Sequence, residues 1–474
     1  MLKLFLMLFT LNSFTIIYSQ SVRQQIDQLL KDEFFQSSIV AADIYNLTTQ
    51  EYLYRVNEKL LLHPASNMKL FTSIAGLLYL GDEYQFITSL YYDGEITGST
   101  LFGNLYIEGG CDPEVTTADL NLFVEALKAS NIKAISGNIY ADLSFKDSIY
   151  WGEGWMWDDD PSTDAPYLSA LNINANSVSI KLNGTNVGQP AEIILEPSSD
   201  FFSIRNNTMT VFGKDEEFFF VTRNWFDRKN EIIATGRVSL ERTSNNLIAD
   251  RKVNVINPEY YFLSLFKETL IKNGISFSGE LNISTLPLIN KYITSKTTSI
   301  IPVLRNVNKN SNNLSSEMLL LALAERFYGR PATFGNGIKV INELIKLVGH
   351  EPAKYRILDG SGVSHYNLVS AELITDMLKY IYINEPQVLR NLVQTLPIAG
   401  VDGTLAKRMT NTSAFSNVRA KTGTLSGVSG LSGYVTAANG NQITFSILIQ
   451  NYVNQAGRAR EFQDAICRFL AEYR

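Results

Sequence analysis

The residues best suited to chemistry are Ser66 and Lys69, in the stretch Pro64-Ala65-Ser66-Asn67-Met68-Lys69. A serine hydroxyl needs a nearby base to become a nucleophile. The spacing predicts a helix over 64–81, and residues three apart on a helix meet on one face. Burial or a neighbouring cation lowers the pKa of a lysine until it can accept a proton. Ser66 would also lie where backbone N–H groups are free, so the stretch predicts a serine nucleophile with a lysine base.

Two other Ser-x-x-Lys matches lack this setting. Ser130 ends a predicted helix and Lys133 begins a predicted strand, so their side chains should diverge. Ser264 and Lys267 lie in the middle of an apolar helix, which favours a structural serine.

The three histidines do not suggest a base or a metal site, because His63, His350 and His365 are isolated from one another and from other ligand types in the sequence. We therefore expect no metal.

Two further motifs could complete a site. Ser-x-Asn occurs at Ser311-Asn312-Asn313, which opens an apolar helix, and at 244–246, which has the composition of a turn. Taken alone, the first is as consistent with an ordinary N-cap as with a functional motif. Lys421-Thr422-Gly423 stands before a glycine-rich turn and a predicted strand pair. Lys421 and Thr422 could bind a carboxylate and Gly423 could let a ligand approach, although a lysine on a solvated edge strand fits equally well.

Composition limits the class of protein. The chain has 474 residues, 45% of them hydrophobic and 19% charged, which predicts two or three domains with large cores. Its net charge of −6 argues against nucleic acid as a partner.

The N-terminal segment predicts export. Lys3 is followed by an apolar run from Leu4 to Ile17, and Ser19 suits cleavage, so residues 1–19 are predicted to be a secretory signal peptide. A membrane anchor ranks second because polar residues interrupt the run. We expect a periplasmic protein, soluble or peripherally membrane-associated, with no transmembrane anchor after removal of the signal.

The order of elements predicts an inserted module. Strands and a helix are predicted in the first part of the chain. Short alternating runs that predict a β-rich region extend from about 86 to 300, and helices, a strand pair and a closing helix follow. We predict one domain built from both ends of the chain, at 20–86 and 303–474, an inserted domain from 87–172 and 291–302, and another from 173–290. The first of these contains all three motifs and is the one expected to carry the chemistry. Cys111 and Cys467 could form a disulfide or could both be buried apolar residues.

The three motifs together resemble the signature of penicillin-binding proteins and serine β-lactamases. The long interval between Ser66 and Ser311 resembles the low-molecular-mass class C D-alanyl-D-alanine carboxypeptidase/endopeptidases, the serine peptidase S13 family. Further stretches share this resemblance, at 105–113, 154–159, 359–362 and 396–404. Asn312, where many members carry Asp, and Cys111, where Gly is common, depart from it. The implied fold class is α+β, with helices packed on an antiparallel sheet and a large β-rich insertion.

The resemblance also implies roles. Ser66 would attack the carbonyl between two D-alanines, Lys69 would take its proton, and Ser311 would pass a proton to the leaving amine. Asn313 would position the substrate amide, and Lys421, Thr422 and Gly423 would bind the terminal carboxylate. The oxyanion hole would consist of the backbone N–H groups of Ser66 and Thr424.

The resemblance implies peptidoglycan stem peptides as substrates, β-lactams as covalent inhibitors acylating Ser66, and no need for a metal or organic cofactor. Asp158 and Asp159 could frame a cationic stem residue, while Asp359, Ser361 and Asp402 would be rim or structural residues. The inserted domains are expected to be dispensable for acylation but not for substrate choice. Two alternatives are a β-lactamase or esterase on the same scaffold, and a wall-binding protein with an inactive site. Oligomeric state and the main activity, carboxypeptidase or endopeptidase, stay open.

Overall fold

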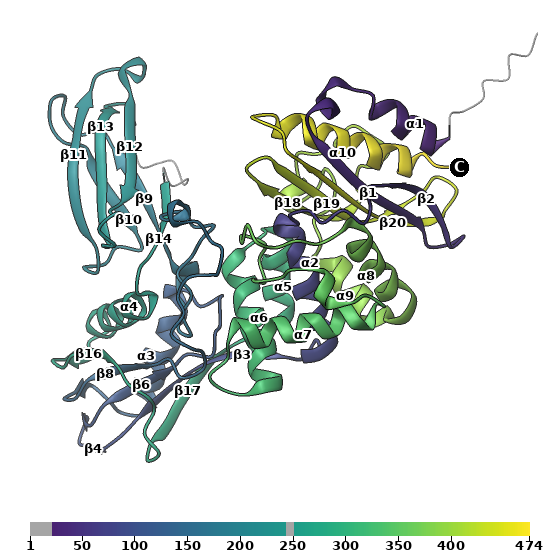
Figure 1. The fold of residues 1–474 in the computed structure, drawn as a ribbon. Helices are drawn as coiled ribbons and strands as arrows, with labels where there is room; N and C mark the ends of the chain where they lie inside the picture. Colours follow the sequence, from purple (N-terminus) through teal and green to yellow (C-terminus); the bar gives the residue numbers. More distant parts are fainter. Residues whose placement is uncertain (1–20, 243–250) are drawn as a thin grey trace, which may run out of the picture.

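The computed structural model describes residues 21–242 and 251–474, so the predicted signal peptide and the Ser-x-Asn match at 244–246 lie outside the described residues. A five-stranded antiparallel sheet joins the two ends of the chain, in the order β18-β19-β20-β1-β2 (Figure 1). Its strands are β1 (Ile39–Asn46), β2 (Glu51–Val56), β18 (Arg419–Leu425), β19 (Val428–Thr436) and β20 (Gln442–Gln450).

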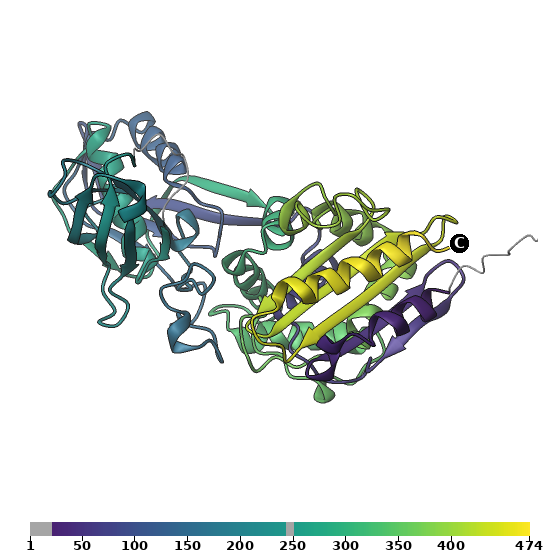
Figure 2. The same cartoon turned by 90° about the horizontal axis from the view of Figure 1, so that it is seen from above.

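Alternating apolar residues give this sheet two buried faces. Along β20, the residues Ile443, Phe445 and Ile447 enter one core, where α1 (Val22–Leu29) and α10 (Ala456–Ala471) cover the sheet. Leu448 points to the opposite core. Figure 2 shows α10 lying along the first of these faces.

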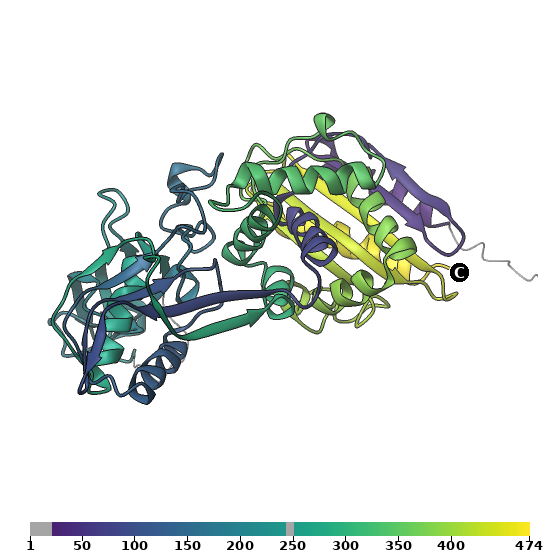
Figure 3. The ribbon, with the colours of Figure 1, turned by 90° about the horizontal axis from the view of Figure 1, so that it is seen from below.

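A group of helices covers the second face (Figure 3). They are α2 (Met68–Ala75), α5 (Ile300–Lys309), α6 (Asn313–Tyr328), α7 (Phe334–Leu347), α8 (Ala371–Asn384) and α9 (Pro386–Thr395). Helix α2 contacts α5, α6 and α7, and α8 contacts β1 and β20. Every residue of α2 is buried, so its side chains are held firmly in place.

The insertion begins and ends on a pair of neighbouring strands. β3 (Gln85–Tyr92) pairs antiparallel with β17 (Lys291–Ser299), with Gln85 opposite Ser299. They belong to a five-stranded sheet of order β16-β8-β6-β3-β17, in which β17 is an edge strand and β3 pairs with both β17 and β6. The other members are β6 (Leu105–Glu108), β8 (Ile139–Asp142) and β16 (Leu281–Ile283), and a smaller sheet contains β4 (Glu95–Thr97), β5 (Thr100–Phe102), β7 (Ala134–Ile135) and β15 (Ser276–Phe277).

The outer part of the insertion contains two three-stranded sheets. One has the order β10-β9-β14 and the other β11-β13-β12. Their bounds are β9 (Ser177–Asn183), β10 (Glu192–Glu196), β11 (Ser203–Val211), β12 (Phe218–Arg223), β13 (Glu231–Ser239) and β14 (Arg251–Asn254). The helices α3 (Leu120–Ala129) and α4 (Pro258–Lys272) share one apolar core with strands of both parts of the insertion.

Most of the predicted helices and strands are present in the structure, and a few differ in extent. The helix expected over 64–81 consists of a 3-10 turn (Ala65–Asn67), α2 and a π-helical turn (Gly76–Leu80). The run from Leu101 to Ile107 forms two strands because it is interrupted at Gly103, where a Cβ would lie 2.1 Å from the Asp93 carbonyl oxygen. Helices α5 and α9 were not predicted.

The two cysteines are both free and buried. Cys111 packs in the core of the helical face and Cys467 in the core under α10, so the disulfide alternative is wrong for this structure. Among the described residues, no helix has the length and apolarity needed to cross a membrane.

Candidate active site

Ser66 lies in the 3-10 turn that leads into α2, one turn before Lys69. Lys69 Nζ donates a hydrogen bond to Ser66 Oγ at 3.0 Å. The turn is tight, since Ala65 has a left-handed φ of 46°. Lys69 is fully buried whereas Ser66 is half-buried and faces a cavity, so the hydroxyl is accessible and its partner is shielded from water.

Lys69 makes two further hydrogen bonds, to the side-chain oxygen of Asn313 and to the Ser361 carbonyl at 2.6 Å. Burial lowers the Lys69 pKa to about 8, against the opposing effect of the Asp359 and Glu317 carboxylates. The three acceptors match the three N–H groups of an ammonium ion. Loss of one proton would leave a lone pair directed at Ser66, which is the state a general base requires.

A buried carboxylate fixes the loop that supplies the Ser361 carbonyl. Glu317 on α6 accepts hydrogen bonds from the backbone N–H groups of Gly360 and Ser361 at 2.8–3.1 Å. Burial and the neighbouring Asp359 raise the Glu317 pKa to about 8. Sequence reasoning missed Glu317, although an acidic residue inside the apolar run of α6 was a visible signal.

Asp359 connects the same loop to the insertion. Its carboxylate accepts from the backbone N–H groups of Gly362 and Ser364 and from the Asn367 side chain. It also accepts from Trp155 Nε1 at 3.0 Å. Asp359 is therefore structural, one of the two roles that the sequence left open.

Ser311 lies in the loop before α6, with a left-handed φ of 58°. The N-cap of α6 is Asn312, whose side chain accepts from Ser315 N at 2.8 Å. Ser311 Oγ is instead bonded by Lys421 Nζ at 2.9 Å. The hydrogen-bond partner of Ser311 is therefore the lysine of the Lys-Thr-Gly motif.

The Lys-Thr-Gly motif lies on β18, the edge strand beside the Ser66 turn. Lys421 is fully buried, which excludes the solvated-lysine interpretation. Burial, followed by the nearby Lys69 ammonium, holds the Lys421 pKa well below its usual value. Thr422 Oγ1 donates to Thr404 Oγ1 at 2.8 Å.

Gly423 has a different reason for being glycine from the one expected. A Cβ there would lie 2.8 Å from the Pro64 carbonyl oxygen and 3.0 Å from Ser66 N. The absent side chain lets β18 approach the backbone of the nucleophile turn, so this close approach, and not only access for a ligand, requires glycine.

These residues line one cavity of about 420 Å³. From the peptidase domain come Ser66, Asn310, Ser311, Asn313, Gly362, Val363, Thr404, Thr422, Thr424 and Leu425, and from the insertion come Asp159, Ser162, Asp164 and Ala165. Lys69 and Lys421 lie directly behind it, bonded to Ser66 and Ser311.

The insertion contributes more to this site than expected. The side-chain nitrogen of Asn313 donates to the Asp164 carbonyl, while its oxygen accepts from Lys69. Asp159 lines the cavity and Asp158 does not. We expected the inserted domains to be dispensable for acylation, but that expectation did not include the contact between Asp164 and Asn313. Nothing in the sequence around Asp164 indicated this contact.

The candidate residues outside the three motifs have structural roles or lie elsewhere in the molecule. Asp402 forms an ion pair with Lys309 and accepts from Ile398 N at 2.9 Å, a structural role. Ser130 caps the end of α3 and Ser264 lies half-buried on α4, both in the insertion. None of the three histidines lines the cavity that contains Ser66.

The site pairs a serine with a buried lysine one helical turn away. A second serine and lysine and the edge strand of an antiparallel sheet lie beside this pair. This arrangement defines the active-site-serine class of penicillin-recognising enzymes. Comparison with known proteins agrees. The sequence profile of the D-Ala-D-Ala carboxypeptidase 3 (S13) family matches residues 22–473. The chain therefore belongs to this family of serine-type carboxypeptidases, and the predicted family is confirmed.

Individual relatives cover most of the chain. A D-alanyl-D-alanine carboxypeptidase of Actinomadura sp. is 30% identical over 95% of this chain and 85% of its own. The D-alanyl-D-alanine carboxypeptidase DacB of Haemophilus influenzae is 29% identical over 86% of this chain and 84% of its own. The crystal structure of penicillin binding protein 4 from H. influenzae has a TM-score of 0.81 at 27% identity, covering 94% of this chain and 99% of that one. This likeness confirms the predicted α+β fold.

Proposed function

We propose that this chain is an exported D-Ala-D-Ala carboxypeptidase that cleaves the D-alanyl ends of peptidoglycan stem peptides through an acyl-enzyme on Ser66. The observation that carries the proposal is the hydrogen bond between Lys69 Nζ and Ser66 Oγ, at the wall of a cavity that Ser311 also lines. The export step rests on the N-terminal sequence, Lys3 followed by the apolar run Leu4 to Ile17.

The first chemical step needs neutral Lys69. The amine keeps its hydrogen bonds to Asn313 and the Ser361 carbonyl and accepts the Ser66 proton as Oγ attacks the penultimate D-alanine carbonyl. The developing oxyanion accepts hydrogen bonds from the backbone N–H groups of Ser66 and Thr424, two residues that line the cavity.

Collapse of the tetrahedral intermediate releases the terminal D-alanine. Ser311 passes a proton to the leaving amine and is resupplied through Lys421, to which it is hydrogen-bonded. Water then attacks the acyl carbon and Ser66 is regenerated. Breaking the bond to a cross-bridge amine follows the same steps, so we propose endopeptidase activity at the same site.

Substrate binding uses residues that lie beside Ser66 in the same site. Lys421 and Thr422 bind the terminal carboxylate beside Gly423, and the second N–H of the Asn313 amide is available to a substrate carbonyl. Asp159 borders the cavity and favours a cationic stem residue. A β-lactam would acylate Ser66 by the same route. The H. influenzae penicillin binding protein 4, solved in complex with a novel β-lactam, has a TM-score of 0.74 to this chain and supports that inference.

We also propose the three-domain division described above, with one amendment: the segment 155–165 of the inserted domain acts as part of the active-site wall. Two contacts support this role, Trp155 to Asp359 and Asp164 to Asn313.

The direct test is covalent labelling. The mature protein and its Ser66→Ala variant are incubated with a fluorescent penicillin and analysed by denaturing gel and intact mass, together with release of D-alanine from a D-Ala-D-Ala peptide. Labelling and D-alanine release by the wild type alone are expected. Fast hydrolysis of the penicillin without a lasting adduct would favour a β-lactamase, and a folded wild type with neither activity would favour a wall-binding protein.

A further inference from the structure

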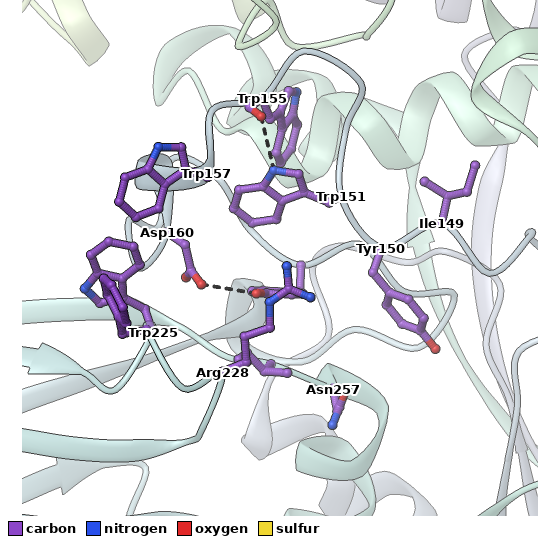
Figure 4. A pocket seen from close by; sticks show the side chains of 12 residues that line it. Ile149, Tyr150, Trp151, Trp155, Trp157, Asp160, Trp225, Arg228 and Asn257 are labelled. Carbon is purple, nitrogen blue, oxygen red and sulfur yellow. Dashed lines mark hydrogen bonds between the residues drawn. The ribbon is translucent and has the colours of Figure 1, made fainter.

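A second and larger cavity, of about 810 Å³, lies wholly within the insertion. Its most distinctive feature is aromatic: the chain contains four tryptophans, and Trp151, Trp155, Trp157 and Trp225 all line it (Figure 4). The remaining lining residues are Ile149, Tyr150, Asp160, Tyr167, Phe226, Arg228, Ile256 and Asn257. A volume of this size is typical of ligand sites in proteins.

The aromatic rings form two groups. Trp151 and Trp155 pack against the helical core, and Trp157, Trp225 and Phe226 cluster nearer the surface. Ring centroids are 5.2 Å apart for Trp157 and Trp225, 5.4 Å for Trp225 and Phe226, and 5.5 Å for Trp151 and Trp155. Trp157 is 67% exposed and Phe226 79% exposed. Exposed large aromatic rings gathered in one place mark a binding surface, because they cost solvation free energy unless something covers them.

Buried polar contacts hold this surface rigid. Arg223 is fully buried and forms an ion pair with Asp160, which also accepts from the Tyr167 hydroxyl at 3.1 Å. Arg223 Nε donates to the Asn254 carbonyl at 3.1 Å. The wall is therefore formed before any ligand arrives, which lowers the entropy cost of binding.

Two polar side chains are free to bind a ligand. Arg228 and Asn257 are exposed residues with left-handed φ values of 51° and 55°. Within 21–242 and 251–474, neither side chain has a hydrogen-bond or ion-pair partner, and Figure 4 shows the Arg228 side chain extending between the tryptophans and Tyr150. They offer N–H donors, and Asn257 an acceptor, to a ligand carrying acyl and hydroxyl oxygens.

One segment, 155–165, contributes residues both to the aromatic cavity and to the cavity that contains Ser66. Trp155, Trp157 and Asp160 line the aromatic cavity, and Asp159 and Asp164 line the other. A polymer whose reacting end lies at Ser66 could therefore extend into the aromatic cavity.

We propose that the aromatic cavity binds the glycan strand of peptidoglycan, by stacking N-acetylated amino sugars on the tryptophans while Arg228 and Asn257 bond their acetamido and hydroxyl oxygens. The proposal rests on the proposed function for its choice of polymer. Pyranose rings present flat C–H faces that pack on aromatic rings, whereas the short alanyl and acidic residues of a stem peptide would leave this surface largely uncovered. The inference assigns the insertion a substrate class of its own.

The test uses a sugar that contains no peptide. Chitotetraose, an oligomer of N-acetylglucosamine, is titrated into the full-length Ser66→Ala protein while tryptophan fluorescence is recorded. Because all four tryptophans line this cavity, the signal reports on it directly. The variants are Trp157→Ala and Arg228→Ala, and the matched control is Phe218→Ala, an aromatic residue that is 78% exposed on β12.

A saturable spectral shift, weakened about tenfold or more in both variants and unchanged in Phe218→Ala, is expected. In the wild-type background, the variants should lose about tenfold more activity on intact, glycan-bearing peptidoglycan than on a free D-Ala-D-Ala peptide. Absence of a saturable shift at millimolar sugar would overturn the proposal, and so would a shift produced by a sugar-free stem peptide instead. If no D-alanine is released from any substrate, the proposed function is wrong. The sugar titration still tests, independently of that result, whether the aromatic cavity binds the sugar.

Discussion

Lys69 Nζ lies 3.0 Å from Ser66 Oγ and, with its other two hydrogen bonds, uses all the donors of an ammonium ion. In the proposed mechanism this contact has two states. The charged lysine donates to Ser66 and keeps the hydroxyl unreactive, and the neutral lysine would accept the serine proton. The fraction of neutral Lys69 would then control the rate of acylation.

The pH dependence of acylation follows from this relationship. Burial lowers the Lys69 pKa to about 8, and the reactive form is the deprotonated one present above the pKa. The rate of labelling by a fluorescent penicillin should rise with pH, with a midpoint near pH 8, and fall about tenfold for each unit below it. Stopped-flow or timed gel measurements from pH 6 to 9 check this, and a flat profile would contradict a lysine base.

Asn313→Asp should move that profile to higher pH. The new carboxylate would lie against Lys69 and stabilise the ammonium, so the Lys69 pKa rises and acylation at pH 7 falls. It would also replace the N–H donor that bonds the Asp164 carbonyl. The matched control is the adjacent Asn312→Asp, because Asp caps a helix as well as Asn does. A profile that shifts equally in both variants would argue against the contact with Lys69.

Gly423→Ala should impair acylation more than folding. The added Cβ would come within 2.8 Å of the Pro64 carbonyl oxygen and force β18 away from the Ser66 turn. We expect a loss in acylation rate of about 10²-fold, the usual effect of disturbing catalytic geometry. Gly335→Ala on α7 is the control, since its Cβ would meet no heavy atom within 4 Å. Normal acylation by the Gly423 variant would show that the close approach is unimportant.

Asp359→Asn should destabilise the protein. Each carboxylate oxygen accepts from two N–H donors, Oδ1 from Gly362 and Asn367 and Oδ2 from Ser364 and Trp155. Whichever oxygen becomes the amide nitrogen, it faces two of these donors. Leaving such buried donors unpaired costs about 1–3 kcal/mol each. Urea denaturation measures the change, with the exposed Asp158→Asn as a control expected to stay within about 0.5 kcal/mol of wild type. Equal stability of both variants would contradict the structural role of Asp359.

Sequence patterns predicted the parts of the site that depend on residues close together in the chain. Ser66 and Lys69 lie one helical turn apart, and the apolar spacing of α6 and α10 was visible in the sequence. The family resemblance then brought Ser311 and Lys421 to the same site, which spacing alone could not do. The α+β fold followed from the order of the elements and that resemblance.

The remaining features depend on contacts between distant segments. Glu317 supports a loop that lies some forty positions further along the chain, and the Asp164 carbonyl reaches Asn313 from the insertion. A backbone carbonyl carries no sequence signal, so the second contact could not be predicted. The close packing at Gly423 was missed for the same reason, because the Pro64 carbonyl that a Cβ would meet belongs to another element.

The order of strands in the peptidase sheet has a consequence for the synthesis of the protein. β1 and β2 leave the ribosome early, but the neighbour of β1 is β20, which is made only after the whole insertion and most of the helices. Lys421 arrives on β18, almost as late. A growing chain therefore already carries Ser66 and Lys69 on α2 but has neither the sheet against which they pack nor the second lysine. Hydrolytic activity should therefore appear only when translation is nearly complete.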